Sequence, residues 1–354
     1  MEKKRIDYLD ILKFFGILFI YVGHFLGNAG HLYKFVFEFH VPLFFFLSGC
    51  TENLSKDTSI IKSIYKKFKG ILVPFYVFSV VSIVFAVLIY GEDLSFVKEA
   101  LIATLKGSVR NEYFASSLWF LSCLFVVCVM FRFMKLFRYK FIIAAISIGL
   151  FVFENLATVN IPEYYNIKSA LHYQIYYVLG YFLFSFADKI LTSEKPAFRV
   201  TKLILFAYSF AFTALLFFGK NIFAPLANME VLCYIKTILT PLSAIWFFLN
   251  LSYILKDASL LSKLGKETLY FCGSEYIIKR TVGAFIEVFV ALRITNGATA
   301  LIYSFLLLLL TYHLLVPAET KILNLINSKI DCFFEIITNS VKKFLPAKNS
   351  AENI

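Results

Sequence analysis

Runs of apolar residues close to twenty residues long, separated by short polar segments, recur along the whole chain. A helix of about 20 apolar residues spans the hydrocarbon core of a bilayer, so we predict an all-α, polytopic membrane protein with about ten transmembrane helices. The predicted spans cover 9–27, 35–54, 70–90, 117–134, 140–156, 170–187, 201–219, 235–255, 268–292 and 298–316.

The basic residues between the spans predict how the chain is oriented. If the first residue lies inside the cell, the even-numbered connections are cytoplasmic, and these hold most of the Lys and Arg. Cytoplasmic loops of membrane proteins are enriched in Lys and Arg, so we predict that both termini are cytoplasmic. Residues 1–318 would form the membrane domain, and residues 319–354 a cytoplasmic tail with an amphipathic helix at the membrane surface.

The composition supports the membrane class. Of the 354 residues, 60% are hydrophobic and 16% are charged, whereas about 25% of a soluble domain is charged. Mean hydropathy is +0.76. The net charge of +12 comes largely from the orienting loops, so membrane lipid and not nucleic acid is the expected partner. The six cysteines lie mostly in apolar segments without CxxC spacing, so we expect buried thiols and no metal site.

Ionisable residues interrupt the first two spans. Lys13 and His24 lie in the first, and Glu38 and His40 lie in or near the start of the second. A charge at the bilayer centre costs about 3 kcal/mol on insertion scales, so such residues usually face the protein interior and mark function. Eleven helical steps of about 100° place Lys13 and His24 on one side of the helix, about 16 Å apart.

Three further expectations concern this pair of spans. Asp10 precedes Lys13 by three residues, a spacing at which opposite charges meet on a helix. His24 and His40 should lie at a similar depth, and an imidazole suits proton removal from a hydroxyl near neutral pH. Pro42 should kink or locally open the second span.

The ninth span holds four ionisable residues, Glu275, Lys279, Arg280 and Glu287. Glu275 and Lys279 are four residues apart, which allows an ion pair within the helix. Two interpretations stay open: a self-neutralised structural pair, or a span that faces a cavity filled by water or ligand. The basic residues of the cytoplasmic connections either bind the phosphate groups of a ligand or only set the orientation of the chain in the membrane. The candidate phosphate-binding residues are Lys66, Lys67, Lys69, Arg132 and Lys135.

Several motifs resemble one family. The segment YLDILKFFGILFIYVGH resembles the opening of the acyltransferase family 3 membrane proteins, in which a basic residue, ten others and then a histidine occur in the first span. FEFHVPLFFFLSG resembles the second-span signature of that family, and YKKFKGILVPFY and SLWFLSCLFV follow in the same order. Two positions depart from the family: Lys13 replaces the usual Arg, and Glu275 stands where His is frequent.

The resemblance implies an enzyme that moves an acyl group, usually acetyl from cytoplasmic acetyl-CoA, to a sugar hydroxyl of a surface or exported glycan. The first-span histidine of the family is essential, so His24 is the expected general base or transient acyl carrier. Lys13 would stabilise negative charge on a CoA phosphate or on the oxyanion, and His40 would support His24 or the acceptor. Substrate binding is assigned to Glu38, Trp119, Glu275, Lys279 and Arg280.

We therefore predict a polysaccharide O-acetyltransferase of a bacterial plasma membrane, with acetyl-CoA as co-substrate and no metal. Its acceptor would be a polysaccharide or a lipid-linked sugar, and assembly into a homo-oligomer stays open. The alternative is a transporter of a glycan or another solute, since intramembrane His, Glu and Lys also occur in transporters. Repeat halves, the usual sign of a transporter, are not evident in the sequence.

Overall fold

The computed structural model describes residues 6–55, 59–115, 117–156, 161–219, 230–286, 288 and 293–344, with the side chains of 230–233 and 337–344 left out. Within these ranges every regular element is helical. The α-helices are α1 (Asp7–Gly23), α2 (His31–Phe37), α3 (His40–Asn53), α4 (Ile60–Lys67), α5 (Val73–Tyr90), α6 (Leu94–Leu105), α7 (Trp119–Met134), α8 (Lys140–Leu156), α9 (Ile167–Thr192), α10 (Pro196–Phe217), α11 (Glu230–Ile254), α12 (Ser259–Lys266), α13 (Thr268–Ile278), α14 (Gly297–Leu314) and α15 (Val316–Phe344).

Short segments with tighter or wider turns join several of these helices. Two are 3₁₀ turns, η1 (Leu26–Ala29) and η3 (Tyr164–Asn166). Two are π-helical, η2 (Phe68–Leu72) between α4 and α5, and η5 (Lys279–Gly283) after α13. Single π-helical turns occur frequently at functional sites; η2 lines two of the cavities described below, and η5 begins with Lys279, which contacts Glu275.

The helices support a multi-pass membrane protein. Six helical segments are long and apolar enough to cross a membrane, namely His31–Asn53, Ile60–Tyr90, Tyr164–Thr192, Pro196–Phe217, Tyr234–Ile254 and Gly297–Leu314. The other four predicted spans also coincide with helices, but α1 and α8 have 17 residues, α7 has 16 and α13 has 11. The count of ten spans and the cytoplasmic position of both termini therefore stay predictions.

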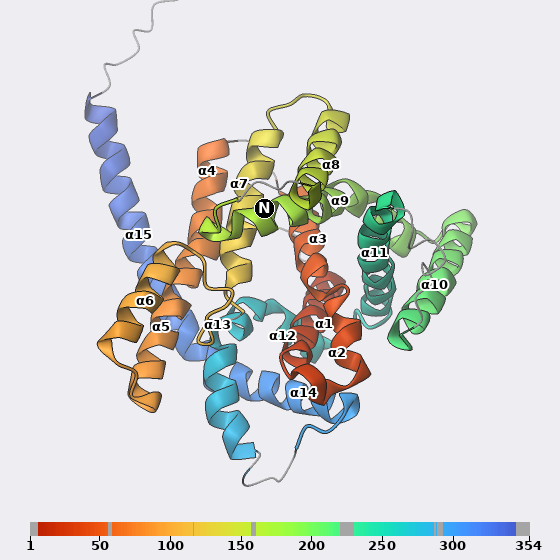
Figure 1. Ribbon diagram of the computed structural model, residues 1–354. Coiled ribbons are helices and arrows are strands. Elements are labelled where there is room, and N and C mark those ends of the chain that lie inside the picture. Colours follow the sequence, from red (N-terminus) through yellow and green to blue (C-terminus); the bar gives the residue numbers. More distant parts are fainter. Residues whose placement is uncertain are drawn as a thin grey trace, which may run out of the picture.

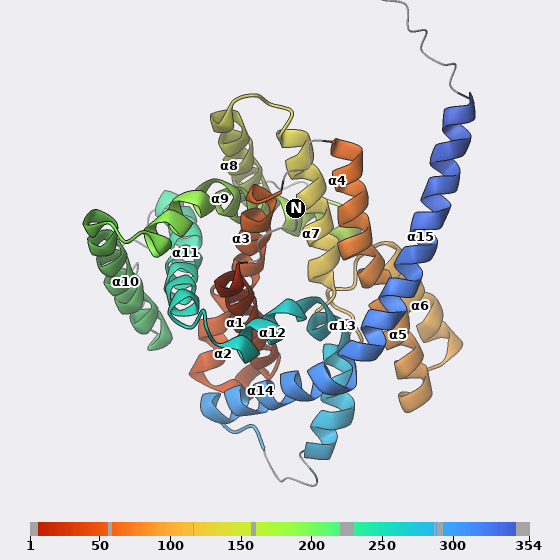
Figure 2. The same cartoon turned by 180° about the vertical axis from the view of Figure 1, so that it is seen from behind.

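Helix α1 lies in the middle of the bundle, in contact with α2, α3, α11, α12, α13 and α14. Figures 1 and 2 show it among these helices, whereas α10 and α15 lie at opposite edges of the molecule. Most of its residues are buried. A helix that is apolar on all sides is typical of a protein interior, which explains why the few ionisable residues of α1 face other parts of the protein.

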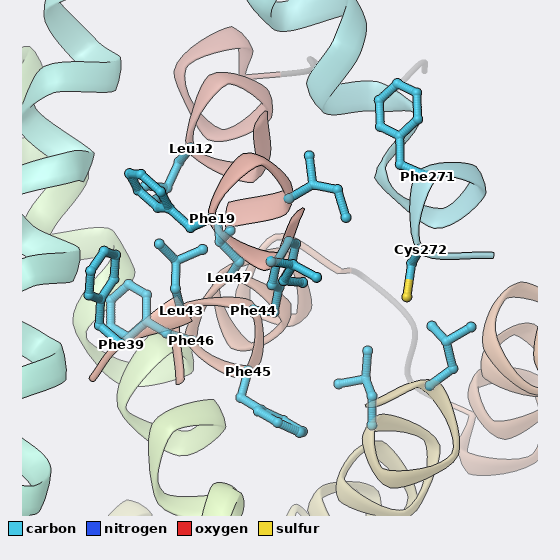
Figure 3. Close-up of a cluster of buried hydrophobic side chains, with 14 of the residues drawn as sticks. Leu12, Phe19, Phe39, Leu43, Phe44, Phe45, Phe46, Leu47, Phe271 and Cys272 are labelled. Atoms are coloured by element: carbon cyan, nitrogen blue, oxygen red, sulfur yellow. The ribbon is translucent and has the colours of Figure 1, made fainter. Parts of the chain in front are cut away.

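Aromatic side chains fill the space between α1, α3 and α11. The ring of Phe248 lies 4.9 Å from that of Phe19 and 5.2 Å from that of Phe39, which it stacks against. Figure 3 shows Phe44 and Phe45 projecting from α3 in different directions, and Phe39 just before this helix. Phe45 points to α9, where its ring stacks on Tyr173 at 4.6 Å. Such edge-to-face and stacked pairs add specific attraction to the burial of apolar area.

Glycines allow α3 and α9 to approach each other closely. A Cβ atom at Gly49 of α3 would lie 2.0 Å from the Tyr177 carbonyl oxygen of α9, and one at Gly180 of α9 would lie 2.0 Å from the Phe46 carbonyl oxygen. Both distances are far inside van der Waals contact, so any larger residue would force the helices apart. Small residues have this role at helix contacts within membranes, where backbone proximity supplies the attraction.

The structure corrects two sequence-based expectations about elements. The predicted connections contain α4, α6 and α12, which have only 8, 12 and 8 residues and are too short for a span-length window. The second span bends between α2 and α3, at Phe39 with φ −145° and ψ −16°, and not at Pro42. Pro42 is the third residue of α3, where the backbone N–H has no partner within the helix in any case.

The expectation of buried cysteines is confirmed at four positions and wrong at one. Cys50, Cys123, Cys128 and Cys272 are buried, but Cys332 on α15 is exposed. The polar face of α15 carries it away from the bundle, and hydropathy along the chain does not separate the two faces of such a helix. The side chain of Cys233 lies outside the described residues.

Candidate functional site

His24 lies at the point where α1 ends. It caps the helix with φ −78° and ψ 1°, and its Nδ1 atom is 2.6 Å from Oε1 of Glu275 on α13. The His24 side chain is 26% exposed, whereas that of Glu275 is 3% exposed. An ionised carboxylate can only accept, so Nδ1 carries the proton and a neutral imidazole keeps its lone pair on Nε2. The contact thus presents Nε2 as a base.

Lys279 completes this arrangement. Its Nζ atom donates to the same Oε1 of Glu275 at 2.5 Å and lies 4.5 Å from the centre of the Phe25 ring. A cation beside the carboxylate favours the ionised form of Glu275. Tyr21 of α1 donates from its hydroxyl to the Phe271 carbonyl oxygen of α13 at 2.9 Å and fixes the two helices relative to each other. We call His24, Glu275 and Lys279 the His24 triad.

The predicted intrahelical pair between Glu275 and Lys279 is therefore confirmed, and the structure adds His24 to it. Oε2 of Glu275 has no hydrogen-bond partner among the described residues. Lys279 is the first residue of the π-helical segment η5. The wider turn of η5 shifts the residues after it to another side of the helix than a continuous α-helix would. Arg280 is exposed and lies 5.9 Å from the Tyr90 ring, away from the triad contacts. Glu287 lies outside the described residues.

Lys13 faces a cavity of about 230 Å³ in the bundle. Its Nζ atom donates to Oδ1 of Asp10 at 2.9 Å, as the spacing predicts, and Asp10 is 2% exposed. Ile20 and Cys272 also line this Lys13 cavity. Since His24 follows Ile20 by four residues and Glu275 follows Cys272 by three, the cavity extends from Lys13 to within one helical turn of the triad.

Three of the five predicted phosphate ligands surround a carboxylate that the sequence analysis did not identify. Glu52, at the end of α3 and 2% exposed, has Lys67 at 3.3 Å, Arg132 at 3.4 Å and Lys135 at 3.9 Å. One carboxylate among three cations leaves an excess of positive charge. A single Glu at the end of an apolar run offers no sequence signal, because its partners come from two other helices.

The other two, Lys66 and Lys69, line a second cavity of about 790 Å³ between α4, η2 and α15. Lys69 donates to Oδ2 of Asp331 on α15 at 2.5 Å. Gly70 lines both this Lys66 cavity and the Lys13 cavity. Both cavities therefore reach the η2 segment, at Gly70.

The remaining predicted site residues have contacts of their own. His40 is 3% exposed and donates from Nδ1 to the Val36 carbonyl oxygen at 2.6 Å. Trp119 is 9% exposed, and the guanidinium group of Arg110 lies 4.3 Å from its ring centre. Glu38 is exposed and lines a third cavity. His40 lies within electrostatic range of His24 and Glu275, without a hydrogen bond to either, whereas the described contacts do not place Trp119 or Glu38 against the His24 triad.

The helices and this site define a multi-pass membrane protein with an ionisable cluster in its interior. A family model described as an acyltransferase domain, that of acyltransferase family 3, matches residues 6–316. The chain therefore belongs to acyltransferase family 3, which confirms the resemblance of its first spans and makes it a membrane acyltransferase. No curated protein and no solved structure matches the chain.

Proposed function

We propose that the protein is a membrane O-acetyltransferase that moves the acetyl group of acetyl-CoA to a sugar hydroxyl of a bacterial surface or exported polysaccharide. The observation that carries the proposal is the contact of His24 with Glu275 at 2.6 Å, in a member of acyltransferase family 3. This contact supports a base at Nε2. The plasma membrane is the location that the long apolar helices and the use of cytoplasmic acetyl-CoA support.

In this proposal Nε2 of His24 removes the proton of the acceptor hydroxyl while the hydroxyl oxygen attacks the thioester carbonyl carbon. The oxyanion collapses, the C–S bond breaks, and the proton passes from His24 to the leaving thiolate. Glu275 stabilises the imidazolium that forms, as a carboxylate on Nδ1 does in other His-dependent acyl transfers. A second route begins with attack of Nε2 itself on the carbonyl carbon, which breaks the C–S bond and releases the CoA thiolate; the acceptor hydroxyl then attacks the acetyl group on His24, the N–C bond breaks, and the proton of the hydroxyl passes to the thiolate.

The cavities support entry of acetyl-CoA from the side of Lys66. Lys66, Lys69 and the cations around Glu52 carry the positive charge that phosphates attract. The thioester end of the donor would extend past Gly70 toward Lys13. Lys13 would then stabilise negative charge, either on the oxyanion or on the donor, and its ion pair with Asp10 holds its side chain at the cavity wall.

Replacement of His24 with Ala tests this function. We expect the variant to reach the membrane at the level of the parent, because Glu275 keeps its ion pair with Lys279, and to lose glycan acetylation, because the proposed base is gone. The measurement is transfer of radiolabelled acetyl groups from acetyl-CoA to glycan in purified membranes, together with mass analysis of surface glycan from a deletion strain. Normal acetylation in the deletion strain would overturn the proposed function and favour a transporter.

A further inference from the structure

A third cavity, of about 410 Å³, lies apart from the Lys13 and Lys66 cavities. It lies between the junction of α2 and α3, the first turns of α9 and the first half of α11, on the side of the predicted outer loops. Its lining includes Phe37, Glu38, His172, Tyr176, Lys236 and Thr240. We call it the Glu38 cavity. Its volume falls in the range of about 300–1,000 Å³ typical of small-molecule sites.

The polar groups of the Glu38 cavity include one that needs a partner. Thr240 is 2% exposed, and its Oγ1 atom has no hydrogen-bond partner among the described residues. A buried hydroxyl without a partner is unfavourable by about 1–3 kcal/mol, so such groups usually meet a ligand or an ordered water. Glu38 adds a carboxylate that accepts and Lys236 an ammonium that donates at the same cavity.

The other polar groups of the lining are already held in place. His172 pairs through Nδ1 with Oε2 of Glu154 at 3.0 Å, and the Tyr176 hydroxyl donates to the Thr237 carbonyl oxygen at 2.7 Å. These contacts fix the rings of both residues at the wall of the cavity. The result is a preformed surface of aromatic faces with acceptors and donors between them. This combination suits a ligand with one apolar face and a rim of hydroxyl groups, which is the chemistry of a sugar ring.

Phe37 connects the Glu38 cavity to the catalytic end of α1. Its ring lines the cavity and packs against Gly23, where an added Cβ atom would lie 2.9 Å from the Phe37 Cε2 atom. The same ring lies 4.8 Å from the His40 ring. Gly23 directly precedes His24, so one aromatic side chain separates the cavity from the backbone that carries the proposed base.

We propose that the Glu38 cavity is the acceptor subsite, which binds a sugar unit of the glycan next to the one that receives the acetyl group. Glu38 accepts from hydroxyl groups of this sugar, Thr240 and Lys236 bond to others, and the exposed ring of Phe37 covers its apolar face. This inference rests on the proposed function, because it assumes a glycan acceptor that reaches His24. In this arrangement the His40 ring, 4.8 Å from the Phe37 ring, packs against Phe37 and holds it at the wall of the cavity.

The test uses the full-length protein purified in detergent, radiolabelled acetyl-CoA and unacetylated glycan isolated from a deletion strain. The variants are Thr240→Val, which removes only the hydroxyl, and Glu38→Gln, which removes the charge. A lost neutral hydrogen bond should raise the KM for glycan about threefold to tenfold, and the lost charged acceptor about tenfold or more. The KM for acetyl-CoA should stay at the parent value in both variants.

Thr213→Val is the matched control. Thr213 on α10 is 5% exposed and its Oγ1 atom also lacks a hydrogen-bond partner among the described residues, but it does not line the Glu38 cavity. We expect this variant to leave both KM values unchanged. Equal glycan KM values in Thr240→Val, Glu38→Gln and the parent would overturn the subsite while leaving the acetyltransferase intact. Transfer without any dependence on the glycan would instead overturn the proposed function.

Discussion

At the scale of single residues, the central contact is one carboxylate oxygen shared by an imidazole and an ammonium group. Oε1 of Glu275 lies 2.6 Å from His24 and 2.5 Å from Lys279. Glu275 therefore has two separable tasks: it orients and later stabilises the His24 ring, and it neutralises Lys279. A substitution at Glu275 alone removes both tasks. Separating them requires a comparison of the single variant with a double variant in which Lys279 is also made neutral.

We expect Glu275→Gln to lower kcat by about a hundredfold or more, because the amide no longer stabilises a charged imidazole during proton transfer. The variant should also unfold at a lower temperature in detergent, since Lys279 is left as an unpaired cation with an 18% exposed side chain. The double variant Glu275→Gln/Lys279→Met should recover thermal stability but not activity. Recovery of both would show that the triad is structural only.

The sequence predicts contacts between these residues only where they are close along the chain. The pairs Lys13 with Asp10 and Glu275 with Lys279 follow from spacings of three and four residues on a helix. The contact of His24 with Glu275 joins residues 251 positions apart, so it depends on how α13 packs against α1. Periodicity identifies the inward face of each helix but not its neighbour across the interface.

At the scale of helices, buried charge joins the end of α3 to α4 and α7. Glu52 and Arg132 are 2% and 4% exposed, and the Nε atom of Arg132 also donates to Ser63 of α4.

We expect Glu52→Gln to destabilise the protein by about 3 kcal/mol, because it leaves buried cations without their carboxylate. The measurement is thermal unfolding in detergent. Glu194→Gln is the control, since its ion pair with Arg199 is exposed and should not matter measurably. Equal melting temperatures for both variants would contradict the role of Glu52.

Helix α15 docks on α4 through a few polar and aromatic contacts. Asp331 accepts from Lys69 and from the Tyr65 hydroxyl, and the Phe334 ring stacks on Tyr65 at 4.2 Å. Hydrogen bonds from Lys69 and Tyr65 lower the pKa of Asp331 below its ordinary value. A lowered folded-state pKa means that the contact stabilises docking above the ordinary pKa and is lost as the pH falls through the lowered one.

We therefore expect Asp331→Asn, which mimics the protonated form, to loosen α15 at neutral pH. The measurement is the rate of tryptic cleavage after Lys329, an exposed residue on this helix, in the parent and in the variant. Cleavage should be faster in the variant than in the parent at pH 7.5, where Asp331 of the parent is ionised because its pKa is lowered. An unchanged rate at pH 7.5 would show that the stacking on Tyr65 suffices.

Hydropathy located the long helices well but not the short ones. A span-length window detects α9 and α14, each of which contains an apolar stretch of 18 residues. It does not detect α12, whose polar and apolar residues alternate with helical periodicity over 8 residues, and it begins the third span at residue 70, although the structure continues that helical segment back through α4 to Ile60. The bend in the second span is placed by the contacts of Phe39 with neighbouring helices, and local sequence rules pointed instead to Pro42.

At the scale of the whole molecule, Gly70 lies at the junction of the linings of the Lys66 and Lys13 cavities, and Ile20 and Cys272 of the Lys13 cavity lie about one helical turn from the His24 triad. The family and the span pattern can be recognised from sequence, but this junction cannot. It depends on the π-helical segment η2, which leaves Gly70 exposed between α4 and α5. If the donor passes here, the bulk of the side chain at position 70 controls access to the site.

Gly70 is suited to a direct test, because an added Cβ atom would meet nothing within 4 Å. Gly70→Ala should therefore leave transfer near the parent rate, whereas Gly70→Trp should fill the junction and lower transfer from acetyl-CoA at least tenfold. The melting temperature of both variants should stay near that of the parent, since the larger ring occupies an open space and displaces no packed atoms. Acetyl transfer at the parent rate through Gly70→Trp would show that the donor reaches His24 by another route, and the phosphate ligands would then have to be sought away from Lys66 and Lys69.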